Sequence, residues 1–180
     1  MKTDTRKHHR RSIRLKNYDY SQPGGYFITI CTQNRECYFG HIKNGSVVLS
    51  PMGEMAHHLW LEIPRHFDHV KIDAFIVMPN HVHGILMIHD NYRRGTTCRA
   101  PPYEKFGNPR PGSIPTVVRS YKSAVTRWCH KNGYEYFQWQ RNYYEHIIRN
   151  GKGLNDIKYY VINNPLKWEE DRNNPKNIEQ

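Results

Sequence analysis

The chain has 180 residues, of which 37% are hydrophobic. The apolar residues fall in clear runs, so we expect one globular domain and exclude a disordered chain. Lysine and arginine outnumber aspartate and glutamate by 27 to 16, for a formal net charge of +11, which favours a polyanionic partner, nucleic acid before an anionic membrane surface.

The predicted domain organisation has a basic N-terminal arm at residues 1–20, a domain at 21–170 and a polar C-terminal tail at 171–180. Residues 91–112 are polar and rich in Gly, Pro and Arg, which predicts a loop insertion. The arm is either an ordinary polar terminus or a segment that grips DNA. No apolar run reaches the roughly 18 residues of a membrane-spanning helix, and the start does not resemble a secretory leader. None of the 4 cysteines forms a C-x-x-C pair, so we expect free thiols and a cytoplasmic protein without a membrane partner.

The first half of the domain carries strand, hairpin and helix signals in that order. Apolar runs predict a strand at residues 26–32 and a hairpin at 41–49, with an Asn-Gly turn between its strands. Ser50 suits the N-cap of the following helix and Pro51 its first position. This helix continues to Pro64, and its apolar residues recur at helical spacing: Met55, Leu59 and Ile63.

The second half repeats the alternation of strands and helices. Two adjacent strands are predicted at residues 70–78 and 81–88, joined by a tight Pro-Asn turn. A basic helix follows at 113–131, another strand lies within 134–149, and a final helix occupies 154–163. Helices that connect antiparallel strands of one sheet define an α+β protein. We therefore predict a ferredoxin-like antiparallel sheet with helices packed on it.

His81 and His83 are separated by one residue inside a strand pattern. Side chains at i and i+2 leave the same face of a strand. Two imidazoles on one rigid face can converge on a single metal ion. The alternative is a pair of half-buried histidines that satisfy ordinary hydrogen bonds.

The final helix directs one apolar stripe to the core at about 100° per residue. The stripe consists of Leu154, Ile157 and Val161. Tyr160 and Asn164 are four residues apart and lie together at one edge of it, whereas Tyr159 points toward solvent. Pro165 disfavours helical geometry at Asn164. A hydroxyl and an amide oxygen at one edge can complete a metal-phosphate site; the alternative is an amphipathic tyrosine at the margin of the core.

This combination of side chains suits phosphodiester chemistry. A metal ion can neutralise a non-bridging phosphate oxygen and orient the phosphate. A tyrosine phenol can attack in line and remain covalently linked to the phosphate, which conserves bond energy for rejoining. Two histidines and an amide leave positions for phosphate and water, and mixed nitrogen and oxygen ligands suit Mg²⁺ or Mn²⁺.

Three sequence blocks carry a resemblance to a known family. Residues 78–85 have the sequence MPNHVHGI, residues 139–150 the sequence WQRNYYEHIIRN, and residues 160–165 the sequence YVINNP. The first block resembles the histidine-hydrophobic-histidine (HUH) motif, and the second is similar to the block that precedes a nucleophile helix. The third resembles a Tyr-x-x-x-Asn-Pro block. In this order they resemble the REP-associated tyrosine transposases, which are single-tyrosine HUH transposases.

The resemblance extends from about residue 26 to residue 168 and implies a HUH-nuclease type of fold. It implies cleavage of single-stranded DNA next to imperfect hairpins, through a 5′-phosphotyrosine intermediate and with a free 3′-OH. By position, His81 and His83 become metal ligands, Tyr160 the nucleophile and Asn164 the third ligand. Related insertion-sequence enzymes often have Gln at that last position, which has a longer reach than Asn.

Basic and aromatic residues predict where DNA binds. The expected phosphate contacts are Arg119, Lys122 and Arg127 on the basic helix and Arg141, His146 and Arg149 around the last strand. Aromatic neighbours such as Tyr143 and Tyr144 can stack on unpaired bases. The alternatives are solvated charges and core aromatics.

Three functions are compatible with these patterns. The first is the metal-dependent nuclease and strand transferase for hairpin-containing single-stranded DNA. The second is a non-catalytic hairpin DNA- or RNA-binding protein derived from a transposase, and the third is a metalloenzyme for soluble phosphoesters. The intact His81, His83 and Tyr160 favour the first, and the charge of +11 argues against the third. We expect a monomer or a homodimer.

Overall fold

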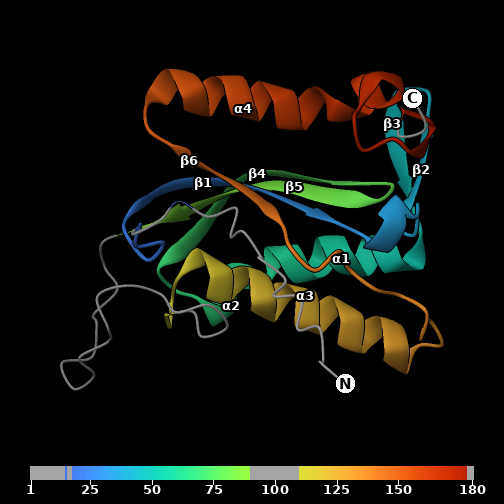
Figure 1. Ribbon diagram of the computed structural model, residues 1–180, viewed down its shortest axis with the longest axis horizontal. Helices are drawn as coiled ribbons and strands as arrows, with labels where there is room; N and C mark the ends of the chain where they lie inside the picture. The colour runs from blue at the N-terminus through green and yellow to red at the C-terminus, as the bar shows by residue number, and fades with distance from the viewer. Residues whose placement is uncertain (1–14, 16–17, 90–109, 178–180) are drawn as a thin grey trace, which may run out of the picture.

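The structure is a computed structural model that describes residues 15, 18–89 and 110–177 (Figure 1). Most of the expected basic arm and of the expected loop insertion therefore lie outside the described residues. Tyr20, at the end of that arm, is buried in the core. The packed part of the chain therefore begins before residue 21.

Four antiparallel strands form the central sheet in the order β4-β5-β1-β6. They are β1 (Gly24–Cys31), β4 (Val70–Met78), β5 (His81–Ile88) and β6 (Tyr144–Ile148). The two central strands, β1 and β5, are almost entirely buried. Each half of the chain contributes one strand–helix–strand unit to the sheet, which confirms the predicted ferredoxin-like α+β fold.

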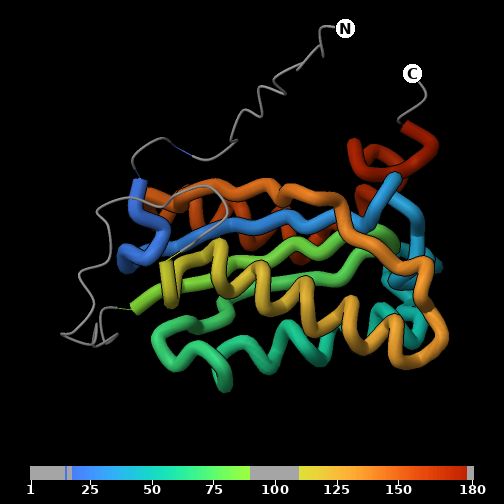
Figure 2. Tube along the Cα trace, turned by 60° about the horizontal axis from the view of Figure 1, so that its bottom comes forward, coloured from blue at the N-terminus to red at the C-terminus, as the bar shows by residue number. Residues whose placement is uncertain are grey.

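Helices cover both faces of the sheet (Figure 1). On one face lie α1 (Pro51–Leu61), α2 (Ile63–His66) and α3 (Ile114–Lys131). Figure 2 shows α1 and α3 side by side on this face. The other face carries α4 (Gly151–Asn163), which packs on β4 and β5.

Polar side chains fix the starts of two helices. The Ser50 hydroxyl accepts a hydrogen bond from the Gly53 amide at 3.2 Å, which confirms the predicted N-cap of α1. Asn150 caps α4 in the same way, because its Oδ1 accepts from the Gly153 amide at 2.8 Å. For this reason α4 begins at Gly151 rather than at residue 154.

The larger core fills the space between the sheet and the helices α1 and α3. In α1 the buried side chains are Met52, Ala56 and Trp60, whereas Met55 and Leu59 are only partly buried. Leu59 nevertheless packs against the core, and Ile63, which lies in α2 because α1 ends at Leu61, is buried. The largest fully buried side chain of α1 is Trp60, whose indole lies against Gly84 of β5.

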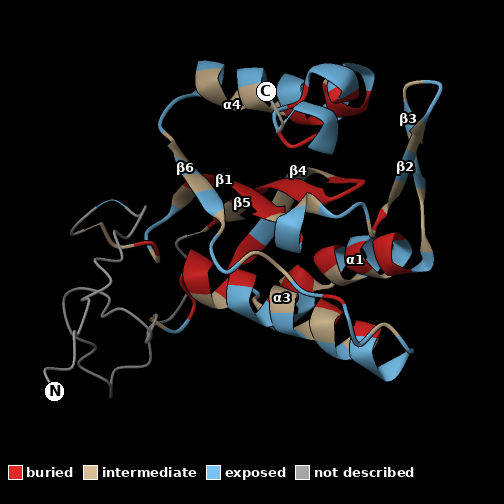
Figure 3. Ribbon diagram, turned by 45° about the vertical axis from the view of Figure 1, so that its right-hand side comes forward, coloured by how far each residue is buried: buried red, intermediate tan, exposed pale blue. Residues whose placement is uncertain are grey.

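A smaller core lies between the sheet and α4. It combines Phe27 of β1, Ile85 of β5 and Val161 of α4, all buried. Leu154 and Ile157 pack against it, so the predicted apolar stripe of the final helix is confirmed. Figure 3 shows the opposite, outward surface of α4 as largely exposed.

A separate hairpin projects from the sheet. It consists of β2 (Gly40–Lys43) and β3 (Ser46–Leu49). Its turn residues Asn44 and Gly45 have φ angles of 50° and 71°. Positive φ at both positions is what a type I′ turn requires, so the Asn-Gly signal is confirmed.

The C-terminal segment turns back over the sheet after α4. It contains the short 3₁₀ helices η2 (Asn164–Glu170) and η3 (Pro175–Asn177). Three polar residues of the expected tail are buried: Asp171, Asn173 and Asn174. These residues belong to the packed structure because their polar atoms are hydrogen-bonded inside it. In the part of the chain that the structure describes, no helix is long and apolar enough to cross a membrane.

Candidate functional site

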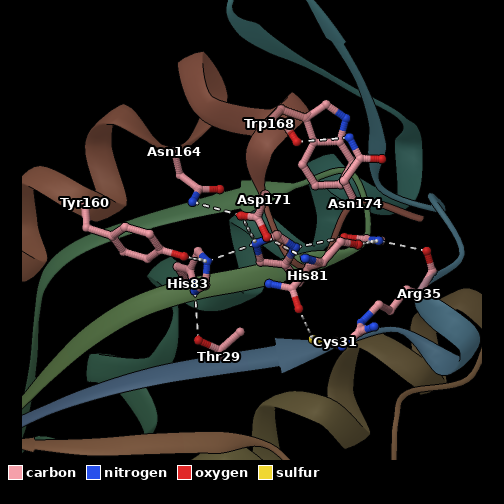
Figure 4. Close-up of polar contacts among 12 residues, drawn as sticks. Thr29, Cys31, Arg35, His81, His83, Tyr160, Asn164, Trp168, Asp171 and Asn174 are labelled. Atoms are coloured by element: carbon pink, nitrogen blue, oxygen red, sulfur yellow. Dashed lines mark hydrogen bonds and ion pairs between the residues drawn. The ribbon is translucent and has the colours of Figure 1, made fainter. Parts of the chain in front are cut away.

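His81 and His83 project from β5 into the space between the sheet and α4 (Figure 4). Their side chains are 0% and 1% exposed. The Nε2 atoms of the two rings lie 3.0 Å apart. The two histidines therefore share one face of the strand, as the i, i+2 spacing predicted.

Asn80 determines which nitrogen of His81 faces this space. Its Nδ2 donates to the carbonyl oxygens of Arg35 at 2.8 Å and Asn173 at 2.7 Å. Its Oδ1 therefore faces Nδ1 of His81, at 2.8 Å. An amide oxygen only accepts, so Nδ1 carries the proton and Nε2 presents a lone pair. Asn34 and Arg35 both have positive φ, 53° and 56°, and this tight turn directs the Arg35 carbonyl at Asn80.

Burial keeps both imidazoles neutral. It lowers the pKa of His81 to about 3, and the charges of Arg35 and Arg172 act in the same direction. The pKa of His83 is also lowered, first by burial and then by His81. Thr29 holds Nδ1 of His83 at 2.8 Å. Neutral imidazole is the form that ligates metal ions.

Asp171 brings a carboxylate to the two histidines. It is 7% exposed, and its Oδ2 lies 4.0 Å from Nε2 of His81. Ligand atoms of His81, His83 and Asp171 all lie within 4.8 Å of one another. Sequence reasoning missed this residue because it lies in an irregular segment without periodicity. The only signal was a cluster of turn-forming residues at 171–174.

Asn164 also reaches the cluster. Its Nδ2 donates to Oδ2 of Asp171 at 3.0 Å, while its buried Oδ1 has no hydrogen-bond partner among the described residues. Rotation of the amide by half a turn would direct the oxygen toward the same space as the carboxylate. The backbone of Asn164 stays helical, with φ −57° and ψ −39°, although Pro165 follows. The predicted i, i+4 neighbourhood with Tyr160 is therefore kept.

Tyr160 reaches the histidines from α4. Its hydroxyl lies 3.3 Å from Nε2 of His83, and 39% of the residue remains exposed. Tyr159 is 67% exposed and directed elsewhere, as its helical phase predicted. Burial raises the pKa of Tyr160; the charge of Asp171 raises it further, and the charge of Arg172 lowers it.

The donor set fits a divalent cation. An octahedral ion with ligand bonds of about 2.1 Å separates neighbouring ligand atoms by about 3.0 Å, the distance between the Nε2 atoms of His81 and His83. Two bare nitrogens at that distance repel each other unless a proton or a cation lies between them. Asp171 adds a hard oxygen ligand, and the unpaired oxygen of Asn164 is a fourth candidate. Mixed nitrogen and oxygen ligands are compatible with Mn²⁺ and Mg²⁺.

The basic residues predicted on α3 lie on the other side of the sheet from α4 (Figure 1). Arg119 and Arg127 are exposed there. Lys122 is turned inward, and its ammonium donates to the carbonyl oxygens of Gln140 at 2.6 Å and Arg141 at 3.4 Å. Burial lowers the pKa of Lys122 to about 8. These bonds connect α3 to the segment before β6.

The second predicted basic group surrounds β6, the edge strand next to β1. Arg141 precedes the strand, His146 lies within it and Arg149 follows it, and all three are exposed. His146 pairs in register with Phe27. Only strand β1 therefore lies between β6 and strand β5, which carries His81 and His83.

The fold can be assigned to a class by comparison with a solved structure. A REP-associated tyrosine transposase bound to a REP hairpin superimposes with a TM-score of 0.56 and 23% sequence identity. The match covers 86% of this chain and 73% of the transposase chain. The protein therefore has the fold of the REP-associated tyrosine transposases, which confirms at the level of fold the resemblance carried by the three sequence blocks.

A sequence relative places the chain in a family. An uncharacterized protein of Haemophilus influenzae is 46% identical over 169 residues, which cover 92% of this chain and 93% of the relative. The chain belongs to the same family as this Haemophilus influenzae protein. No protein-family model matches the chain.

Proposed function

We propose that this protein is a divalent-metal-dependent endonuclease and strand transferase for single-stranded DNA, which cuts near DNA hairpins through a 5′-phosphotyrosine intermediate. The observation that carries the proposal is the 3.3 Å approach of the Tyr160 hydroxyl to Nε2 of His83. This approach puts a partly exposed nucleophile beside the cluster of His81, His83 and Asp171. A module that only binds nucleic acid has no need of such an arrangement.

The chain's own side chains would hold the metal. His81 and His83 offer Nε2, Asp171 offers a carboxylate oxygen, and Asn164 offers its amide oxygen after rotation. When bound, Mg²⁺ or Mn²⁺ supplies positive charge for a non-bridging oxygen of the scissile phosphate. Thr29 orients the ring of His83 through Nδ1, and such outer contacts are part of a working metal site.

The covalent step uses Tyr160. Its phenolic oxygen attacks the phosphorus in line, the new O–P bond forms and the bond from phosphorus to the 3′ oxygen breaks. The phenol proton leaves to solvent through the exposed part of the side chain, and the departing 3′ oxygen takes a proton from water. Rejoining reverses the step with a different 3′-OH. Burial raises the pKa of Tyr160, so the phenol is protonated before the reaction.

DNA would lie on the α4 side of the sheet, along β6. Arg141, His146 and Arg149 are exposed around this edge strand, and positive side chains there can bind phosphates. The fold neighbour is a transposase bound to a REP hairpin, which supports a hairpin as the substrate. Lys122 acts in this proposal as a positioning residue, since its ammonium already donates to the carbonyl oxygens of Gln140 and Arg141.

The test is incubation of the protein with labelled hairpin DNA that carries single-stranded flanks, in the presence of Mn²⁺. We expect a covalent protein–DNA band that resists denaturation, disappears in excess EDTA and is absent from Tyr160→Phe. A wild-type protein that binds the hairpin but never forms the band would be a non-catalytic hairpin-binding protein. A band that persists in Tyr160→Phe would overturn the assignment of the nucleophile.

A further inference from the structure

Arg172 is the one exposed residue in the buried turn at 171–174. The carboxylate of Asp171 accepts from the amide of Asn173 at 2.6 Å. The amide of Asn174 donates to the Asp171 carbonyl at 2.9 Å, and its side chain donates to Trp168 at 2.9 Å. These hydrogen bonds fix the backbone before and after Arg172, which directly follows the candidate metal ligand Asp171.

The guanidinium of Arg172 lies over the ring of Tyr144, with Cζ 5.6 Å from the ring centroid. Such a cation–π contact limits where the arginine can move. Among the described residues the guanidinium has no hydrogen-bond or ion-pair partner. Its N–H donors are therefore available to a ligand.

Tyr144 of β6 and His83 of β5 lie at the same level of the sheet, with β1 between them. Tyr144 pairs with Thr29 of β1, and Thr29 pairs with His83 of β5. The ring of Phe27 contacts both Tyr144, at 6.3 Å between centroids, and Tyr160, at 6.1 Å. Tyr144 is 44% exposed, so an aromatic surface and a guanidinium lie together, with the ring of Phe27 in contact with both Tyr144 and Tyr160.

We propose that Arg172 and Tyr144 form a nucleotide clamp that holds the DNA residue next to the scissile phosphate. Arg172 donates to a phosphate oxygen of the backbone, because a guanidinium fork matches phosphate geometry. Tyr144 stacks on the adjacent unpaired base, because any base offers a π face. The clamp rests on the proposed function and adds to it the groups that position the strand at the cut.

The clamp selects for strand state rather than for sequence. Stacking tolerates every base, whereas a paired and stacked base in a duplex does not expose its face. Arg172 contributes charge but no base-specific contact. The nucleotide next to the cut should therefore need to be unpaired but can vary in identity.

The experiment uses the full chain with Tyr160→Phe as the background, so that binding is measured without cleavage. Arg172→Ala, Tyr144→Leu and Tyr144→Phe are compared on hairpin DNA with a single-stranded flank. Single abasic nucleotides are placed on either side of the phosphate that wild-type protein cuts. Lys176→Ala is the matched control, since it also removes one exposed positive charge near the C-terminus, where Lys176 pairs with Glu169 at 3.3 Å.

We expect Tyr144→Leu to weaken binding about 5- to 150-fold, the effect of one lost base stack, and Tyr144→Phe to bind like the background. An abasic nucleotide at one of the two positions should weaken DNA binding by the background protein to the same degree. The same abasic nucleotide should leave DNA binding by Tyr144→Leu unchanged. Arg172→Ala should weaken binding and slow adduct formation when Tyr160 is present, with unchanged Mn²⁺ affinity, whereas Lys176→Ala should resemble the background.

Three results would overturn the clamp. The first is that Arg172→Ala and Tyr144→Leu bind hairpin DNA as tightly as the Tyr160→Phe background. The second is that an abasic nucleotide weakens DNA binding of Tyr144→Leu further. The third is that Arg172→Ala lowers the affinity for Mn²⁺. Failure of the proposed function is recognised separately. In that case wild-type protein forms no covalent adduct on any of the hairpin substrates.

Discussion

Asn80 and His81 are joined by a 2.8 Å hydrogen bond that decides which imidazole nitrogen faces the candidate metal position. The same amide donates to the carbonyls of Arg35 and Asn173. One side chain thus connects the turn after β1, the C-terminal segment and the histidine pair. The orientation of His81 depends on three segments that are far apart in sequence.

The first prediction concerns metal affinity. Asn80→Ala removes the acceptor for Nδ1 of His81, so the ring can rotate and its tautomer is no longer fixed. We expect Mn²⁺ affinity to fall about 10- to 100-fold, the usual effect of losing such an outer contact. Titration calorimetry with Mn²⁺ measures this directly.

Ligand variants provide the scale for that measurement. His81→Ala and Asp171→Ala should abolish measurable Mn²⁺ binding, while Asn164→Ala should cost less because water can replace an amide oxygen. Asn132→Ala, at an exposed position at the end of α3, serves as the control for an amide lost elsewhere. Unchanged affinity in Asn80→Ala would show that its hydrogen bond does not orient the metal ligand.

The second prediction concerns the nucleophile. Tyr160→Phe removes only the hydroxyl that approaches His83, so folding and hairpin binding should persist while adduct formation falls at least about 1,000-fold. Tyr159→Phe is the matched control on the neighbouring position, which is 67% exposed. Denaturing gels with end-labelled DNA report both variants. Loss of the adduct in Tyr159→Phe alone would identify Tyr159 as the nucleophile and contradict the assignment to Tyr160.

Periodicity predicted much of this arrangement. Alternation in β5 placed His81 and His83 on one face, and the helical phase of α4 brought Tyr160 to them. Asp171 escaped prediction because its approach depends on how the chain folds back after α4, which no local pattern encodes. The packing of Trp60 on Gly84 likewise joins residues that are distant in sequence, and no local pattern predicts it.

The third prediction concerns that contact. A Cβ at Gly84 would lie 2.2 Å from Cζ2 of the fully buried Trp60, so Gly84→Ala must displace the indole or the strand. We expect it to lower the free energy of unfolding by about 1–3 kcal/mol. Denaturant titration measures the change.

Gly151→Ala is the matched control for Gly84→Ala. No atom lies within 4 Å of a Cβ at Gly151, so this substitution should be neutral or stabilise the protein by up to about 1 kcal/mol. Combining Gly84→Ala with Trp60→Phe should recover part of the loss, because the smaller ring leaves room. Equal stability of the Gly84→Ala and wild-type proteins would contradict the packing argument.

The fourth prediction follows from the buried ammonium of Lys122. Burial lowers its pKa from 10.5 to about 8, so between these values the unfolded chain binds more protons than the folded one. Wild-type stability should therefore rise relative to Lys122→Met as pH increases from about 8 to about 10, by about 1–3 kcal/mol. Denaturant titrations of both proteins across this range test it; parallel pH profiles would mean that the ammonium is not desolvated.

The last prediction locates the DNA path on the molecule. Arg141 precedes β6 and Arg149 follows it, at the edge strand along which we propose that DNA lies, whereas Arg127 is a residue of α3. For single strands, each lost phosphate contact should reduce the slope of log affinity against log salt by about 0.7. Fluorescence anisotropy with hairpin DNA at several salt concentrations should show that change for Arg141→Ala and Arg149→Ala, and an unchanged slope for Arg127→Ala. All three substitutions remove one positive charge, so a general effect of net charge would act on them equally, and only their position can separate them. A smaller slope in Arg127→Ala alone would instead place the DNA on the α3 face, away from Tyr160.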